Sequence, residues 1–155
     1  MNIIIDGYNL LKVLYTSSLD EDIDEFLKII EGYRQDKKCK ITVIFDGYNN
    51  YSLKENEKKF GGTRVIYTSR DIKADKKIID LAKQIGKGVI VISSDNFVKN
   101  NVERYGAVTI SSQDFIENIF GEDFDEDYDF KDIKKGNPQK LKRKERLKQK
   151  TLKKL

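Results

Sequence analysis

The chain has 155 residues, with 30 Lys and Arg, 26 Asp and Glu, and no histidine. The missing histidine excludes Ser-His-Asp and Cys-His catalysis, and the single cysteine, Cys39, excludes an internal disulfide and makes a zinc site improbable. We therefore expect an ordinary cytoplasmic domain whose chemistry depends on carboxylates, on lysines, or on oxygen-ligated Mg²⁺ or Mn²⁺.

The first part of the chain reads as strands separated by one amphipathic helix. Residues 2–6 are a short apolar run that ends in Asp-Gly, which is typical of a buried strand. Residues 18–21 have the form of a capping box, and the apolar spacing after them predicts a helix over about 20–35. Residues 40–46 repeat the strand pattern. Residues 48–60 are polar and poorly periodic, which favours a loop with a short helix.

The alternation of strands and helices continues to about residue 120. The expected elements are a strand at 63–68, a helix at 74–85, a strand at 88–93, a short helix at 96–105, a small strand at 107–110, and a helix that runs to about 120 after a second capping box at 111–114. The strands are apolar without alternation, as in sheets covered on both faces. We therefore predict an α/β fold with a central parallel sheet of about five strands flanked by helices.

Four aspartates are expected at one edge of this sheet. Asp6 and Asp46 end strands, Asp95 follows another, and Asp75 lies in the first turn of the helix after the third long strand. Because the carboxyl ends of parallel strands lie together, these side chains should converge. Clustered carboxylates raise each other's pKa unless a cation separates them, and Mg²⁺ or Mn²⁺ would suit oxygen ligands. Such an ion activates water and screens charge on phosphate oxygens without histidine.

Simpler roles exist for each residue taken alone. Asp75 is also a favourable charge at a helix N-terminus, and Asp95 is also a helix cap. Asn9 either orients water or a phosphate, or satisfies the backbone of its own loop. Tyr8 either stacks on a base near the crevice or packs in the fold, and the same choice applies to Tyr48 and Tyr51. Four acids at one edge favour a shared metal site over four separate local roles.

The stretches that contain these acids resemble a known family. They are Ile-Ile-Ile-Asp6-Gly-Tyr-Asn9-Leu-Leu, Val-Ile-Phe-Asp46-Gly, Val-Ile-Tyr-Thr68 leading to Ala74-Asp75, and Ser-Ser-Asp95. Over about residues 2–119 the chain resembles the NYN-domain, PIN-like ribonucleases, and their YacP-like branch in particular.

The resemblance implies a PIN-like Rossmannoid fold, an acidic metal-binding pocket, and endonuclease action on RNA. In some YacP-like proteins the RNA is messenger RNA on the ribosome. The resemblance also implies that Asp6, Asp46, Asp75 and Asp95 are site positions, with Asn9 beside them. We predict that Asp6, Asp75 and Asp95 hold Mg²⁺ or Mn²⁺.

The chain departs from the family pattern in one place. The family often has a glutamate four residues after the helix aspartate, and this chain has Ile79 there. The departure motivates an alternative, a non-catalytic RNA- or ribosome-binding adaptor with the same fold. An aspartyl-phosphate phosphatase is disfavoured, because it would need a second aspartate where Tyr8 stands.

Charge divides the chain into three parts. Residues 1–120 carry 18 basic and 18 acidic side chains, residues 121–130 add 6 acidic ones, and residues 131–155 carry 12 basic and 2 acidic ones. We predict a catalytic domain over 1–120, an acidic linker over 121–136, and a basic tail over 137–155 that is disordered alone or helical on RNA.

Basic side chains in two places are candidates for RNA contacts. The residues are Arg70, Lys73, Lys76 and Lys77 around Asp75, and Lys142, Arg143, Lys144 and Arg146 in the tail. Lysine and arginine neutralise phosphates and give salt-dependent affinity, so messenger or ribosomal RNA is the expected partner. Alternatively the tail aids solubility or folds back on the acidic linker, and the domain residues are ordinary surface charges. With no long apolar run and no signal peptide pattern, we expect no membrane partner.

Overall fold

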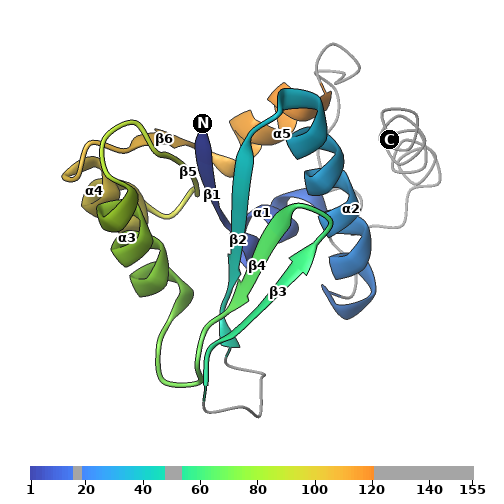
Figure 1. The fold of residues 1–155 in the computed structure, drawn as a ribbon, viewed down its shortest axis with the longest axis horizontal. Coiled ribbons are helices and arrows are strands. Elements are labelled where there is room, and N and C mark those ends of the chain that lie inside the picture. The colour runs from blue at the N-terminus through green and yellow to red at the C-terminus, as the bar shows by residue number, and fades with distance from the viewer. Residues whose placement is uncertain (16–18, 48–53, 121–155) are drawn as a thin grey trace.

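The computed structural model describes residues 1–15, 19–47 and 54–120, and it shows an α/β fold with a six-stranded sheet (Figure 1). The elements are β1 (Asn2–Asp6), α1 (Gly7–Leu14), α2 (Leu19–Lys37), β2 (Lys40–Phe45), β3 (Asn56–Phe60), β4 (Thr63–Tyr67), α3 (Ala74–Ile85), β5 (Ile90–Ile92), α4 (Asn96–Glu103), β6 (Val108–Ile110) and α5 (Ser112–Phe120). No helix in these ranges is long and apolar enough to cross a membrane.

The strand order across the sheet is β3-β4-β2-β1-β5-β6. All neighbouring pairs are parallel except β3 and β4, which form an antiparallel hairpin at one edge. β1 is therefore central, with β2 on one side and β5 on the other. In this register Asp6 pairs with Ile44 of β2, and Ile5 pairs with Ile92 of β5.

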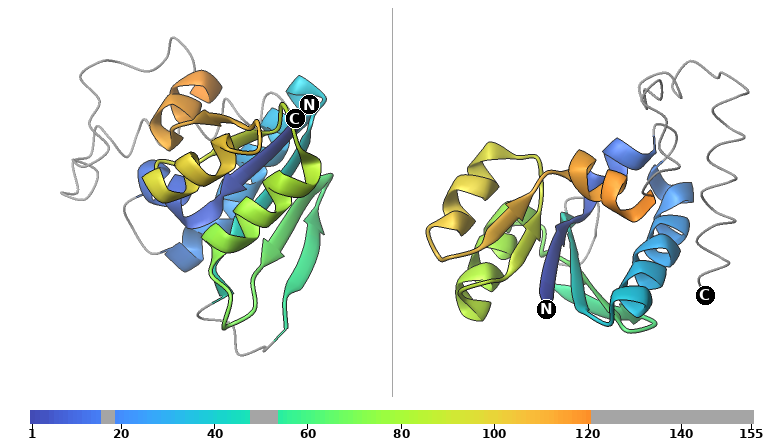
Figure 2. Two further views of the ribbon diagram at one scale, coloured as in Figure 1. Left: turned by 90° about the vertical axis from the view of Figure 1, so that its left-hand side faces the viewer. Right: turned by 90° about the horizontal axis from the view of Figure 1, so that it is seen from above.

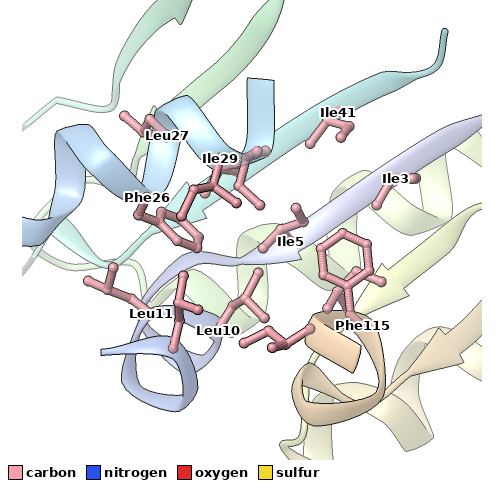
Figure 3. Packing of buried hydrophobic residues seen from close by; sticks show 14 of the residues in the cluster. Ile3, Ile5, Leu10, Leu11, Phe26, Leu27, Ile29, Ile41 and Phe115 are labelled. Atoms are coloured by element: carbon pink, nitrogen blue, oxygen red, sulfur yellow. The ribbon is translucent and has the colours of Figure 1, made fainter. Parts of the chain in front are cut away.

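Two hydrophobic cores lie on opposite faces of the sheet, because successive strand side chains point to opposite faces. Ile3 and Ile5 of β1 belong to a core covered by α1, α2 and α5, whereas Ile4 belongs to a core covered by α3 and α4. Figure 2 shows the two helical layers with the sheet between them. Figure 3 shows Ile5 packed among Leu10 of α1 and Phe26 of α2. Burying each such side chain stabilises the fold by roughly 1.5–3 kcal/mol.

The structure confirms the predicted parallel α/β architecture and most predicted elements, and it corrects the sequence analysis in the first half of the chain. Residues 7–14 form a helix that the sequence analysis did not predict. Residues 56–60 form a strand, so the expected loop with a short helix is wrong there and the sheet has six strands. β3 lacks strand periodicity because it is an edge strand exposed along most of its length.

Cross-strand contacts hold β3 in place where hydrophobic burial does not. Glu57 of β3 forms an ion pair with Arg64 of β4, and the ammonium of Lys58 lies 5.3 Å from the ring centroid of Tyr67. Such pairs between strands stabilise a hairpin even when its apolar area is small.

Several features of the sequence analysis lie outside the described residues. They are Ser18 of the first capping box, Tyr48, Tyr51, the acidic linker and the basic tail.

Candidate functional site at the carboxyl edge of the sheet

The chain leaves β1 and β5 toward opposite faces of the sheet. After β1 it enters α1, which packs in the core with α2 and α5, and after β5 it enters α4, which packs with α3. Since β1 and β5 are neighbours, a crevice is expected between their carboxyl ends, and open α/β sheets bind ligands at such a position. Asp6 ends β1 and Asp95 follows β5, so both acids border this position.

The side chain of Asp6 is held by the strand next to its own. The buried hydroxyl of Ser93 donates a hydrogen bond of 3.0 Å to Oδ2 of Asp6, and it accepts one of 3.1 Å from the backbone N–H of Asp95. Burial raises the pKa of Asp6 from 3.8 to about 6. The Ser93 hydrogen bond lowers the pKa, whereas the charges of Asp95 and Asp75 raise it further. Asp75 and Asp95 are therefore close enough for their charges to act on Asp6.

Asp75 and Asp95 also have the local roles that the sequence left open. Asp95 is the N-cap of α4, and its Oδ1 accepts hydrogen bonds from the backbone N–H groups of Phe97 (2.8 Å) and Val98 (3.4 Å). Asp75 lies in the first turn of α3, half-buried, and accepts a hydrogen bond from the N–H of Lys76. Each carboxylate thus favours the start of a helix and at the same time adds negative charge near Asp6.

Asp46 directly follows β2, beside the end of β1, and is half-buried. The next residue, Gly47, donates its N–H to the hydroxyl of Thr68 at 3.0 Å. A Cβ at position 47 would lie 1.6 Å from the carbonyl oxygen of Thr68, so no side chain fits there. In the same way, a Cβ on Gly7 would lie 2.5 Å from the ring of Phe45. Both Asp-Gly pairs therefore place an aspartate where two chain segments approach closely.

Asn9 connects three segments at this edge. Its Oδ1 accepts hydrogen bonds from the backbone N–H of Ser94 at 2.9 Å and from the hydroxyl of Ser112 at 2.6 Å, and the N–H of Ser112 donates to Oγ of Ser94. Asn9 lies in α1, so the suggestion that it satisfies its own loop is wrong. The N–H of Ser94 can only donate, which fixes the carbonyl oxygen of the amide as its partner. The amide nitrogen remains as the donor for a ligand.

The donor chemistry at this edge suits Mg²⁺ or Mn²⁺, since the available ligands are carboxylate oxygens. Among the described residues, however, no three His, Cys, Asp or Glu side chains lie close enough together to hold one ion. The expected direct ligation by three aspartates is therefore not seen. Mg²⁺ often binds one or two carboxylates directly and keeps several waters. The site therefore still suits an ion that is bound directly by Asp6 and through water by Asp75 and Asp95.

The remaining candidates have different surroundings. Arg70, Lys73 and Lys76 are exposed, while Lys77 forms an ion pair of 2.9 Å with Glu55. The four candidate tail residues, from Lys142 to Arg146, lie outside the described part of the chain.

Two residues near the site pack in the fold. Tyr8 packs edge-on against Phe45 with ring centroids 5.0 Å apart, as the packing alternative predicted. Ile79, at the position of the family glutamate, packs against the core under α3 and α4.

Sequence reasoning missed the polar residues that position the acids. Ser93, Ser94 and Ser112 make the hydrogen bonds described above, and the charge of Lys12 acts on Asp6 by lowering its pKa. A signal was present, because two Ser-Ser pairs occur at the ends of expected strands. Serine at a strand end is common enough that this pattern alone does not separate a site residue from a turn residue.

Fold and site together define an α/β protein of the PIN-like class with an acidic edge on its parallel sheet. The family model described as the YacP-like NYN domain matches residues 3–155, and the chain belongs to that family, which is a family of ribonucleases.

Two solved structures share the fold. The crystal structure of Rae1 (YacP) from Bacillus subtilis is similar with a TM-score of 0.63 and 22% identity, covering 99% of this chain and 91% of that one. A single-residue variant of Rae1 is similar with a TM-score of 0.62 and 22% identity, and the match covers 77% of this chain and 74% of that one. No curated protein matches the chain.

Proposed function

We propose that the chain is an endoribonuclease that depends on Mg²⁺ or Mn²⁺ and hydrolyses RNA phosphodiester bonds at the carboxyl edge of β1. One observation supports this most strongly. Asp6 is a largely buried carboxylate whose pKa is raised to about 6, and the charges of Asp75 and Asp95 act on it. Burial and the nearby charges of Asp75 and Asp95 make an ionised Asp6 unfavourable in the bare protein, whereas a divalent ion would stabilise the ionised form, and this suits a member of a ribonuclease family.

Each residue of the site has a defined task in this proposal. Asp6 would bind the ion directly, Asp75 and Asp95 would hold it through water molecules, and Asp46 would add negative charge at the same edge of the sheet. A divalent ion at this site supplies activation of water and neutralisation of charge on the phosphate oxygens. Ser93 fixes the orientation of the Asp6 carboxylate, and above pH 6 that carboxylate is mainly ionised and able to bind a cation.

RNA would be held by groups around these acids. Arg70, Lys73 and Lys76 are exposed before and within the first turn of α3, where they can neutralise backbone phosphates near Asp75. The amide nitrogen of Asn9 adds a neutral donor. The basic tail over 137–155, joined to the domain by the acidic linker, would raise the affinity for messenger or ribosomal RNA in a salt-dependent manner. Cleavage of messenger RNA on the ribosome is the form of the activity that we propose.

The experiment that tests this function compares Asp6→Asn with the parent protein on a panel of single-stranded and structured RNAs, each with Mg²⁺, Mn²⁺ or EDTA. Asp36→Asn is a matched control, because Asp36 is exposed near the end of α2, at the opposite edge of the sheet. We expect cleavage by the parent and by Asp36→Asn only with metal, and a loss of at least about 100-fold in Asp6→Asn. Equal cleavage by Asp6→Asn would reject the assignment.

A non-catalytic RNA- or ribosome-binding adaptor is the second candidate, and Ile79 is the observation that favours it. An isoleucine side chain has no atom that can ligate a metal, and this one packs against the core at the position of the family glutamate. The adaptor predicts ribosome co-sedimentation that is lost when residues 137–155 are deleted and is unchanged in Asp6→Asn, with no cleavage under any metal. The enzyme predicts cleavage that disappears in Asp6→Asn whether or not the tail is present.

A further inference from the structure

Two large apolar side chains are exposed beside the acids. Ile72, with 41% of its surface exposed, lies three residues before Asp75, and Phe97, with 59% exposed, lies two residues after Asp95. Both belong to the carboxyl edge of the sheet, because the loop after β4 leads to α3 and the loop after β5 leads to α4. Figure 2 shows α3 and α4 side by side on one face of the sheet.

Phe97 has no structural task that explains an aromatic side chain. α4 buries Val98 and Val102 against the core, and Phe97 lies one position away from that face. Its exposure leaves apolar area in water, which is unfavourable by about 25 cal/mol per Å². Single exposed apolar residues are common on protein surfaces, so exposure alone indicates nothing. What distinguishes Phe97 is that its exposed ring belongs to a residue next to the acidic site.

The backbone holds Phe97 close to the acids. Its N–H donates to Oδ1 of Asp95 at 2.8 Å, and two residues of chain separate the two Cα atoms by at most about 7 Å. The charge of Asp95 in turn acts on Asp6. A base attached to a phosphate at the site therefore lies within reach of this ring, since successive nucleotides on a protein surface stack on aromatic side chains.

On the basis of the ribonuclease function proposed above, we propose that Phe97 is a stacking platform for one base of a single-stranded RNA whose phosphate occupies the site. Along the chain Phe97 follows the polar residues Asp95 and Asn96, and Ile72 lies between the charged residues Asp71 and Lys73. A protein partner would need a continuous apolar patch, which these neighbours interrupt. A stacked base needs one ring only, and every base offers a π face, so binding here is tolerant of sequence.

The test measures binding of the full chain to labelled single-stranded RNA of mixed sequence, in EDTA so that no metal-dependent cleavage occurs, and again in Mg²⁺ before cleavage sets in, because the proposed site takes a phosphate with its ion bound. Phe97→Leu keeps an apolar side chain without the ring, and Phe97→Tyr keeps the ring. Tyr105→Leu is the matched control, because Tyr105 is an aromatic residue with 39% exposed surface just before β6, at the opposite edge of the sheet. We expect Phe97→Leu to weaken binding at least about fivefold, and the other two variants to bind like the parent.

A second measurement identifies the contact itself. 2-Aminopurine is placed at each position of the RNA in turn, and its fluorescence should be quenched at one position by the parent and by Phe97→Tyr, but not by Phe97→Leu. Equal binding and equal quenching by Phe97→Leu and the parent would overturn the stacking proposal.

The outcomes also separate stacking from catalysis. A parent that cleaves RNA while Phe97→Leu shows no binding defect would leave the enzyme standing and reject stacking. If the parent never cleaves RNA and only Phe97→Leu shows a binding defect, stacking would be supported and the enzyme would be rejected. A parent that binds no RNA either in EDTA or in Mg²⁺ would reject both proposals.

Discussion

The hydroxyl of Ser93 donates a hydrogen bond of 3.0 Å to the carboxylate of Asp6 and thereby joins the ends of β5 and β1. The same oxygen accepts the backbone N–H of Asp95, so one buried hydroxyl orients the Asp6 carboxylate and fixes the backbone at Asp95. Because these strands lead to helices on opposite faces of the sheet, this contact lies where a ligand of an open α/β sheet is expected.

Ser93→Ala tests this relationship. The variant loses the hydrogen bond to Asp6 and the acceptor for the N–H of Asp95, so both acids become less well positioned. Residues that orient metal ligands typically contribute about 10- to 100-fold in metal affinity or activity, and we expect a loss in that range for Mn²⁺ affinity and RNA cleavage. Ser111→Ala is the control, because Ser111 caps α5 by accepting the N–H of Asp114 and should affect stability only. Unchanged Mn²⁺ affinity in Ser93→Ala would contradict the positioning role.

Asp6→Asn should stabilise the metal-free protein. Folding raises the pKa of Asp6 from 3.8 to about 6, so the folded state binds this proton more tightly than the unfolded state. The resulting stabilisation is fully present below about pH 4 and is lost as the pH rises through 6. At pH 8 in EDTA the ionised carboxylate is therefore unfavourable, and the variant should gain up to about 3 kcal/mol in unfolding free energy by urea denaturation. Asp36→Asn should change little. A destabilised Asp6→Asn variant in EDTA would contradict this electrostatic account of the site.

Glu31 connects α2 to the β3–β4 hairpin, and Glu31→Gln should destabilise the fold. Its buried carboxylate accepts hydrogen bonds from the side chains of Arg34 and Thr63 and from the N–H of Gly62. The Arg34 hydrogen bonds and the other donors hold the pKa of Glu31 well below its usual range. A lowered pKa stabilises the fold above the unfolded value near 4.5, and this contribution is lost as the pH falls below it.

We expect Glu31→Gln to lower the unfolding free energy at pH 7 by about 3 kcal/mol, with a smaller difference from the parent at pH 3. Glu117→Gln, at an exposed position of α5, is the control and should behave like the parent. An equal effect of Glu31→Gln at both pH values would show that the charge of Glu31 is not what stabilises the hairpin.

Gly47→Ala should be far more damaging than Gly86→Ala. A Cβ at position 47 would lie 1.6 Å from the carbonyl oxygen of Thr68, so β2 and β4 must separate and Asp46 must move. At Gly86 there is open space, and alanine meets only the backbone strain of φ 86° and ψ −153°, about 1–3 kcal/mol. Thermal unfolding should rank the stabilities as parent, Gly86→Ala, then Gly47→Ala. The reverse order of the two variants would reject the close approach of these strands.

The sequence predicted those parts of the fold that depend on burial. β1, β2, β4 and β5 are short apolar runs buried on both faces, and α3 has a clear apolar face, so both patterns can be found in the sequence. β3 could not be found in this way, because most of its residues are exposed and cross-strand pairing to β4 stabilises it instead. α1 was missed because Asp-Gly-Tyr-Asn is also a good turn sequence, and only contacts with β1, α2 and α5 make it a helix.

The site was predictable in its acids but not in its hydrogen bonds. Parallel strands that end in aspartate bring Asp6, Asp46 and Asp95 to one edge whatever the details of packing. The partners of Asn9 are Ser94 and Ser112, which are 85 and 103 positions away along the chain. Such contacts depend on the tertiary arrangement of three segments, and no local pattern in the sequence encodes them.

The most direct test of the metal site is a crystal of the protein soaked in Mn²⁺, with anomalous scattering measured at the edge of β1. The account predicts an anomalous peak in contact with an oxygen of Asp6 and within reach, directly or through water, of Asp75 and Asp95. In crystals of Asp6→Asn treated in the same way this peak should be absent. A protein that cleaves RNA with Mn²⁺ but shows no peak at Asp6, or an Asp6→Asn variant that keeps the peak, would contradict the account.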